Sequence, residues 1–196
     1  MSNSTILPAD AGVESQYLPV IRLWVLRVLV RRADRSHPLL QANDRAKEIR
    51  SFLGLGRSAS NAVEPQEAED VLRAQLAAAE RRPCTLPENT RLACDVRKIA
   101  CDLGLCDVER DILHFACLVK KYEPLALSID GLGGLSLGRL FQIFGICLGY
   151  PMQRVRAAME RRKVLALLAP SQRFLSDGSS FVGIWGNRVR ISHIYG

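Results

Sequence analysis

Residues 137–163 read LGRLFQIFGICLGYPMQRVRAAMERRK, and this stretch decides which fold we expect for the chain. Gly149 divides the stretch, because glycine adopts the left-handed backbone conformation that ends a helix without steric cost. Pro151 is suited to open the next helix, where its missing N–H is no loss. Before the glycine, apolar residues recur at helical spacing: Leu140, Phe141, Phe144 and Leu148. The stretch therefore predicts two short helices joined by a tight turn, which is the outline of a helix-turn-helix.

The second predicted helix, residues 151–163, is basic. Met152, Val155 and Met159 are expected to face the core, because they recur at helical spacing. The opposite face is expected to carry two arginines and two alanines: Arg154, Arg161, Ala157 and Ala158. A basic second helix is typical of DNA-binding helix-turn-helix proteins, but the same unit also serves as a packing module.

The last part of the chain, residues 170–196, has the alternation and the glycine-containing turns of short β-hairpin arms. A hairpin after a helix-turn-helix is the arrangement of a winged helix. Seven basic residues are therefore candidate nucleic-acid contacts: Arg154, Arg156, Arg161, Arg162, Lys163, Arg188 and Arg190. Against DNA binding, Arg156 is expected to pair with Glu160 one turn later, and Gln153 is the one amide there suited to reading a base.

Outside this stretch the chain is also expected to be helical, over residues 17–32, 44–53, 65–82, 87–102 and 108–122 and over a short helix from Glu123. The strongest amphipathic pattern is that of Val108, Ile112, Phe115 and Val119. We expect a mainly α fold, a multi-helix domain with helix-turn-helix pairs and a small C-terminal β-hairpin. Its expected parts are a flexible tail (1–16), an N-terminal helical unit (17–60), a helical middle (65–130) and a winged-helix-like unit (135–196).

Residues 17–32, YLPVIRLWVLRVLVRR, form the most apolar run of the chain. A membrane-spanning helix needs about 20 predominantly apolar residues, and this run is shorter and is interrupted by Arg22 and Arg27. Val20, Leu23, Trp24 and Leu26 are expected to be buried. The run predicts a core helix, and a helix lying on a membrane surface is the alternative because of Trp24 and the basic end.

The net charge of +7 is unevenly distributed. Residues 1–60 carry nine basic and five acidic residues, residues 61–130 carry nine and thirteen, and residues 131–196 carry nine and two. A basic C-terminal third favours a polyanion or an acidic protein as partner. The alternative is a solvated surface whose charge serves solubility.

The six cysteines include no Cys-x-x-Cys pair, and the three histidines are scattered, so no metal site is predicted. Four cysteines within helical patterns are expected to be small buried apolar residues: Cys94, Cys101, Cys117 and Cys147. Asp111 and His114 are expected to form a surface pair rather than a catalytic dyad. Free cysteines without a signal peptide favour the cytoplasm.

Four stretches, in order along the chain, carry a family resemblance: IRLWVLRVLV, LGLG, LGLCDVERDILHFACLV and LSLGRLFQIFGICLGYPMQRVRAAM. Together, over about residues 18–168, they resemble the N-terminal region that precedes the ATPase core in a group of bacterial AAA+ ATPases. The resemblance implies a helical, partly winged-helix module without chemistry of its own. Nucleotide binding would belong to a following domain, and this chain contains no G-x-x-x-x-G-K-[ST] motif.

These observations favour a non-catalytic helical module of interaction or regulation, with a protein as its partner. The alternative is a DNA-binding winged-helix protein that uses the basic helix 151–163. No catalytic residue, metal, cofactor, membrane span or small-molecule site is predicted, since no nucleophile elbow, paired carboxylates or metal-ligand spacing occurs.

Overall fold

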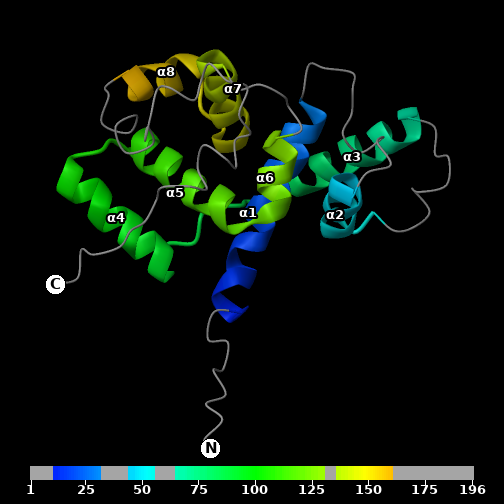
Figure 1. Ribbon diagram of the computed structural model, residues 1–196, viewed down its shortest axis with the longest axis horizontal. Helices are drawn as coiled ribbons and strands as arrows, with labels where there is room; N and C mark the ends of the chain where they lie inside the picture. The colour runs from blue at the N-terminus through cyan, green and yellow to red at the C-terminus, as the bar shows by residue number, and fades with distance from the viewer. Residues whose placement is uncertain (1–10, 32–43, 56–64, 131–135, 161–196) are drawn as a thin grey trace, which may run out of the picture.

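The structure is a computed structural model that describes residues 11–31, 44–55, 65–130 and 136–160. These residues form eight helices, labelled in Figure 1: α1 (Ala11–Val30), α2 (Asp44–Leu53), α3 (Pro65–Glu80), α4 (Arg91–Leu103), α5 (Asp107–Lys121), α6 (Glu123–Asp130), α7 (Leu137–Leu148) and α8 (Met152–Glu160). No strand occurs within the described ranges, and the prediction of a mainly helical protein is confirmed. The predicted hairpin lies outside them.

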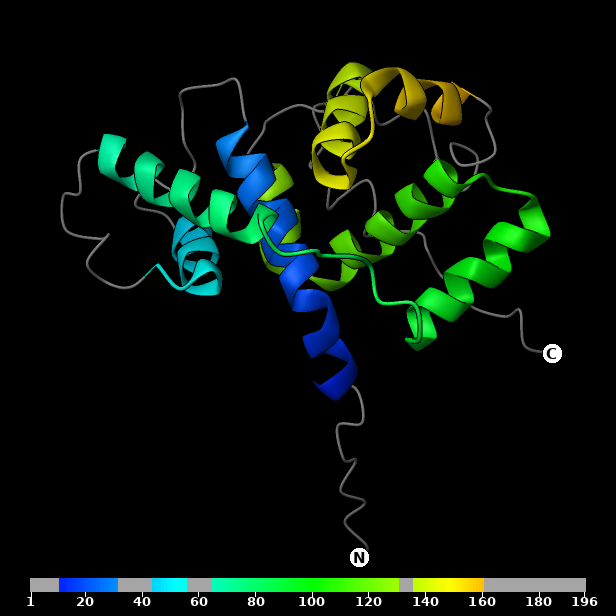
Figure 2. The same cartoon turned by 180° about the vertical axis from the view of Figure 1, so that it is seen from behind.

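Helix α1 lies in the middle of the molecule, with the other helices around it (Figures 1 and 2). Helices α3, α6 and α7 pack directly against it. All four of its residues that were expected to be buried are buried: Val20, Leu23, Trp24 and Leu26. The prediction of a core helix is therefore confirmed over the membrane-surface alternative. One hydrophobic core joins buried residues of α1 to those of the predicted middle and C-terminal units.

Helix α1 begins at Ala11, within the predicted tail and six residues before Tyr17. In a helix that began at Tyr17, Pro19 would lie in the first turn, where proline is well tolerated. In the structure Pro19 lies inside the helix, so its missing N–H removes one intrahelical hydrogen bond. Tyr17 before this proline and Val20 after it are buried, and their burial offsets that loss.

The two arginines of α1 that interrupt the apolar run join it to other helices. Arg22 Nη2 donates to the carbonyl of Leu53 (2.5 Å), the last residue of α2. Arg27 Nη1 donates to the carbonyl of Cys147 (2.8 Å) in the last turn of α7, while Arg27 Nε pairs with Glu80 of α3 (3.0 Å). Carbonyls in a last helical turn lack an intrahelical partner and lie at the negative end of the helix dipole. The arginines satisfy them.

Aromatic rings connect α1, α5 and α7 at the centre of the core. The rings of Trp24 and Phe115 lie 4.9 Å apart, and those of Phe115 and Phe144 lie 5.6 Å apart, edge to face. The predicted apolar face of α5 is confirmed, because Val108, Ile112, Phe115 and Val119 are all buried. Phe115 of α5 therefore contacts both α1 and α7.

Two helix starts differ from the predicted ones. Helix α4 begins at Arg91 rather than near Pro87, because Thr90 caps it by accepting a hydrogen bond from Ala93 N (3.1 Å). The segment before it crosses α1 in the view of Figure 2. Helix α5 has Cys106 rather than Asp107 at its N-cap, where Cys106 N donates to Glu109 Oε2 (2.8 Å). In both helices, a residue near the predicted start takes the N-cap position, so the helix begins at a different residue from the predicted one.

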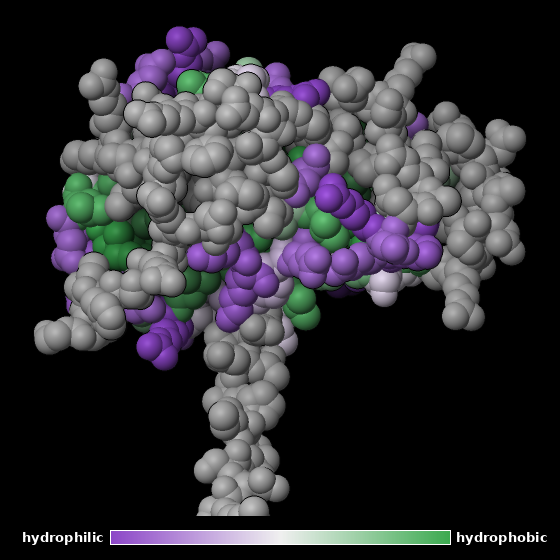
Figure 3. Space-filling view, in the orientation of Figure 1, coloured by the Kyte–Doolittle hydropathy of each residue, from purple (hydrophilic) through white to green (hydrophobic). Residues whose placement is uncertain are grey.

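The surface of the described residues is mixed in character. In the view of Figure 3, hydrophilic side chains cover the region of α2, whereas apolar surface is visible beside α4. The large apolar residues that are exposed are Leu18, Val71, Leu103, Leu137 and Met152. Leu137 and Met152 belong to consecutive helices. Within the part of the chain that the structure describes, no helix has the length and apolar character needed to cross a membrane.

Candidate interaction surface on α7 and α8

Helices α7 and α8 form the tight helical pair that the sequence predicts. Ser136 caps α7 by accepting a hydrogen bond from Arg139 N (3.3 Å). Gly149 ends α7 in the left-handed region (φ 76°), and its N–H donates to Gly145 O (2.9 Å). Pro151 lies directly before α8, which begins one residue later than predicted, at Met152. The helix-turn-helix outline is therefore confirmed for residues 137–160, whereas the winged-helix character stays a prediction.

The buried face of α7 is displaced from the predicted one by about one position. Ile143, Phe144 and Cys147 are buried, whereas Leu140, Phe141 and Leu148 are only partly buried. Phe144 was expected on the apolar stripe and Cys147 was expected among the buried cysteines, whereas the burial of Ile143 was not predicted. The predicted stripe was wrong in detail because α7 is apolar around most of its circumference, and packing on α1 selects one side.

Helix α8 packs on α5 and α7 through Val155, Ala158 and Met159. The burial of Val155 and Met159 was predicted. Ala158 was expected on the arginine face and is buried instead, and Met152 was expected in the core and is 50% exposed. Three or four residues separate the members of a helical face, so Val155, Ala158 and Met159 share one buried face. Met152, three residues before Val155, is the first residue of the helix and is exposed.

Arg154 and Arg156 of α8 are both exposed. The guanidinium of Arg154 lies 5.3 Å from the centre of the Tyr150 ring, which is a cation–π distance. The predicted pair of Arg156 and Glu160 is confirmed, with Nε and Oε1 2.7 Å apart. The remaining candidate contacts lie outside the described residues: Arg161, Arg162, Lys163, Arg188 and Arg190.

An open hollow of about 480 Å³ lies between the N-terminal half of α7 and the exposed side of α8. We call it the α7–α8 hollow, and the described residues that line it are Ser136, Gly138, Arg139, Phe141, Gln142, Met152 and Arg156. Phe141 and Met152 supply apolar surface, and two arginines supply positive charge. None of these lining residues is acidic. The arrangement suits a ligand that combines an apolar group with carboxylates.

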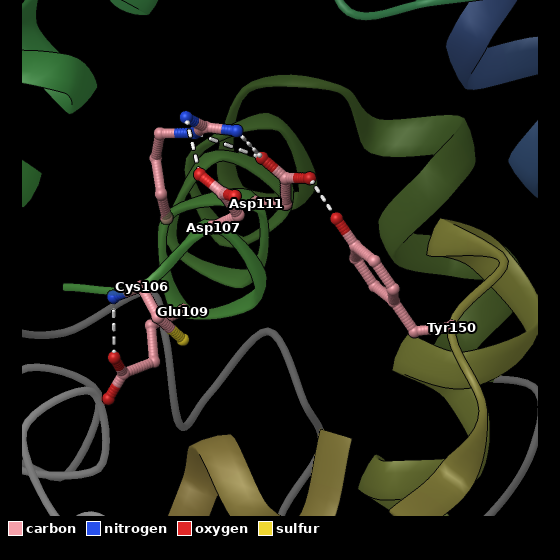
Figure 4. Close-up of polar contacts among 6 residues, drawn as sticks. Cys106, Asp107, Glu109, Asp111 and Tyr150 are labelled. Atoms are coloured by element: carbon pink, nitrogen blue, oxygen red, sulfur yellow. Dashed lines mark hydrogen bonds and ion pairs between the residues drawn. The ribbon is translucent and has the colours of Figure 1, made fainter. Parts of the chain in front are cut away.

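Tyr150, in the turn between α7 and α8, is joined to α5. Its hydroxyl donates to Asp111 Oδ2 (2.7 Å), and Figure 4 shows the side chain pointing from the turn toward α5. Burial, and after it the hydrogen bond to Asp111, raise the pKa of the Tyr150 hydroxyl to about 12. The hydroxyl therefore remains a donor throughout the range in which proteins are stable.

Asp111 and His114 do not form the predicted surface pair. Asp111 binds Arg110 and Tyr150, whereas His114 is buried, with Nε2 3.1 Å from the Tyr17 hydroxyl. That hydroxyl also hydrogen-bonds Thr90. Burial lowers the pKa of His114 to about 4, and the nearby Asp111 opposes that shift only in part. His114 is thus a neutral interior group, and the Tyr17 hydroxyl joins α1 to His114 of α5 and to Thr90 at the start of α4.

The cysteines differ from the expectation of four buried side chains. Cys147 is buried and Cys117 is partly buried, whereas Cys94 and Cys101 are exposed on α4. Burial raises the pKa of the Cys147 and Cys117 thiols, which keeps both protonated. The described residues bring together no group of three or more side chains that could hold a metal ion.

Sequence reasoning missed the α7–α8 hollow and the contact of Tyr150 with Asp111. The hollow depends on the angle between two helices, and the contact joins residues 39 positions apart. One signal for the contact was available, because a tyrosine between a helix-ending glycine and a helix-opening proline has a polar tip that needs a partner when the turn packs inward.

Comparison of the chain with protein-family models, with curated proteins and with solved structures gives no match.

Proposed function

We propose that this chain is a non-catalytic interaction module that binds an acidic segment of a partner protein in the α7–α8 hollow. The observation that carries the proposal is the composition of that hollow, with Phe141 and Met152 beside Arg139 and Arg156. Aromatic residues, methionine and arginine are the types enriched in protein interfaces. A cytoplasmic setting belongs to the same proposal.

The charge of the hollow selects the partner. Two arginines and no acidic residue are among its described lining residues, and the pair of Arg156 with Glu160 is exposed, so a carboxylate of a partner can compete with Glu160 for that arginine. Leu137, 45% exposed, is a further apolar residue at the start of α7. Duplex DNA offers phosphates but little apolar surface, so the exposed leucine and methionine favour a protein ligand over DNA.

The proposal agrees with what the family resemblance implies, namely a helical module without chemistry of its own. The membership of that AAA+ group stays a prediction. The regulated ATPase core would be supplied outside residues 1–196.

A selection from a random peptide library on the full chain tests the proposal. We expect the selected peptides to combine Asp or Glu with Leu, Phe or Trp. The variant Arg139→Glu/Arg156→Glu should bind them at least about tenfold more weakly, since charge repulsion replaces attraction. The matched control is Arg91→Glu/Arg97→Glu, which makes the same charge change on exposed positions of α4 and should bind as wild type does.

Two outcomes would contradict the proposal. The library yields no binder, or the selected peptides show no acidic enrichment and bind the two double variants equally well. Either result would remove the hollow as the binding site.

A second candidate function, binding of duplex DNA, is favoured by the outer side of α8. Gln153 and Ala157 lie one turn apart on the exposed side, with Arg154 on one flank and Arg156 on the other. If this side of α8 entered a groove of the DNA, the Gln153 amide would face base edges and the two arginines would face phosphates. Fluorescence anisotropy with random duplex DNA at two salt concentrations tests it.

For DNA binding we expect an affinity that falls steeply with salt, and a smaller salt slope in Arg154→Ala. The double variant Arg154→Ala/Arg161→Ala should likewise fold and bind DNA more weakly, with a smaller salt slope. Absence of binding at low salt, or an unchanged affinity of the folded variant, would exclude this function.

A further inference from the structure

Tyr150 makes a hydrogen bond that connects the α7–α8 turn to a different part of the fold. Its hydroxyl donates to Asp111 Oδ2 of α5 over 2.7 Å, and both side chains are partly buried. Figure 4 shows the tyrosine reaching across from the turn to α5. The contact lies directly before Pro151 and α8, so it acts on the place where the direction of α8 is set.

Asp111 is itself held in place. Its other oxygen, Oδ1, accepts from Arg110 Nε (3.2 Å) and Nη2 (3.1 Å), and Arg110 Nη1 also pairs with Asp107 (3.1 Å). Charge-assisted hydrogen bonds are stronger and more directional than neutral ones. The acceptor that Tyr150 uses is therefore fixed to the first turn of α5.

Tyr150 is also constrained on its other sides. The Arg154 guanidinium lies over its ring at 5.3 Å. Its backbone carbonyl lies 3.1 Å from the position that a Cβ on Gly145 would occupy, so the turn packs tightly on α7. In contrast, α8 is held on α5 by the apolar residues Val155, Ala158 and Met159, and apolar contact is not directional.

We infer that Tyr150 is a positioning residue, whose hydroxyl orients α8 and thereby places Arg156 and Met152 at the α7–α8 hollow. The hydroxyl is not among the groups that line the hollow, so it acts on the ligand only through α8. This inference rests on the proposed function, because it specifies what sets the affinity of that same site.

The test compares Tyr150→Phe with Ser128→Ala. The first variant keeps the ring under Arg154 and removes the hydroxyl. The second removes a buried hydroxyl whose hydrogen bond to Leu125 O (2.7 Å) lies within α6, away from the hollow. The probe is the tightest-binding acidic peptide from the selection above, labelled with fluorescein. We expect an affinity about fivefold lower in Tyr150→Phe and unchanged affinity in Ser128→Ala.

The same comparison in an Arg156→Ala background separates positioning from a general structural effect. If Tyr150 acts through Arg156, the loss caused by Tyr150→Phe should shrink to less than about twofold there, since no arginine remains to be placed. A loss of the same size in both backgrounds would overturn the inference, and so would wild-type affinity in Tyr150→Phe.

Hydrogen exchange of the free protein distinguishes failure of the inference from failure of the proposed function. Tyr150→Phe should raise exchange in α8 and leave α6 unchanged, whereas Ser128→Ala should do the reverse. If wild type binds no acidic peptide, the proposed function fails, and faster exchange confined to α8 still supports the orienting role of the hydroxyl. Equal exchange of α8 in wild type and Tyr150→Phe would overturn that role.

Discussion

Helices α1 and α8 both carry arginines on otherwise packed helices, yet the arginines face different surroundings. Arg27 has a side chain only 19% exposed, and it contacts a helix-ending carbonyl of α7 and a carboxylate of α3. Arg156 has a side chain 67% exposed, and its pair is Glu160 of its own helix. Burial and helix-end partners therefore make Arg27 a structural element, whereas exposure leaves Arg156 accessible to a ligand.

The largest expected effect is that of Arg27→Met. The variant leaves the carbonyl of Cys147 without its charged donor and frees Glu80 from one of its two arginines. Hydrogen bonds to charged groups contribute about 1.5–3 kcal/mol each, so we expect a loss of about 3 kcal/mol in the free energy of unfolding. Urea denaturation followed by circular dichroism measures it. A loss no larger than that of an exposed arginine would contradict the structural role.

The next effect concerns pH and the buried His114. Its pKa is about 4 in the folded protein, against 6.5 for the ordinary side chain, so the unfolded chain binds the proton more readily. The contribution of the neutral His114 to the free energy of unfolding is therefore fully present above pH 6.5 and is lost as the pH falls toward 4. Linkage gives a loss on the order of 2 kcal/mol between pH 7.5 and pH 5.

The variant His114→Gln isolates this contribution, since carboxylates titrate alike in both proteins. We expect its stability to fall by about 2 kcal/mol less than that of wild type between pH 7.5 and pH 5. Parallel pH profiles of the two proteins, measured by urea denaturation, would show that His114 is accessible to protons in the folded state.

Tyr150→Phe should have an intermediate effect on stability. The lost hydroxyl leaves one oxygen of Asp111 to water or to Arg110, and a hydrogen bond of this kind contributes about 1 kcal/mol. Thermal unfolding should place Tyr150→Phe close to Ser128→Ala. A loss several times larger would mean that the α7–α8 pair separates from α5, and the affinity comparison would then report unfolding rather than orientation.

The smallest effect is expected for Arg154→Ala. The side chain is exposed and its described contact is the face of Tyr150, so the free energy of unfolding should change by about 0.5 kcal/mol or less. Chemical denaturation checks this. A change as large as that of Arg27→Met would place Arg154 with the structural arginines and would remove it from the candidate contacts.

Much of the helical architecture was predictable because its signals are local. The periodicity of Val108, Ile112 and Phe115 identified the buried face of α5, and Gly149 identified the end of α7. The exact starts of the helices were predicted less well than the helices themselves. Thr90 rather than Pro87 starts α4, and Pro19 lies inside α1 because the packing around it outweighs one missing hydrogen bond.

The candidate site was predictable only in part. Arg154 was expected on the outer side of α8 and is exposed there, and Gln153, the amide suited to reading a base, is exposed as well. The hollow was not expected, because Arg139 and Arg156 come from different helices and no spacing along the chain relates them. Periodicity also assigned Met152 to the core, since it shows which residues share a helical face and does not show which of them the fold buries.

The sequence by itself determined that this protein is mainly helical, where most helices lie, and that residues 137–160 form a pair with a tight turn. These features depend on neighbours within one or two helical turns. Only the tertiary structure decided which carbonyls Arg22 and Arg27 satisfy, that His114 is buried beside Tyr17, and that Tyr150 reaches Asp111. Those contacts join residues distant along the chain, and their partners are set by how the helices pack rather than by any local pattern.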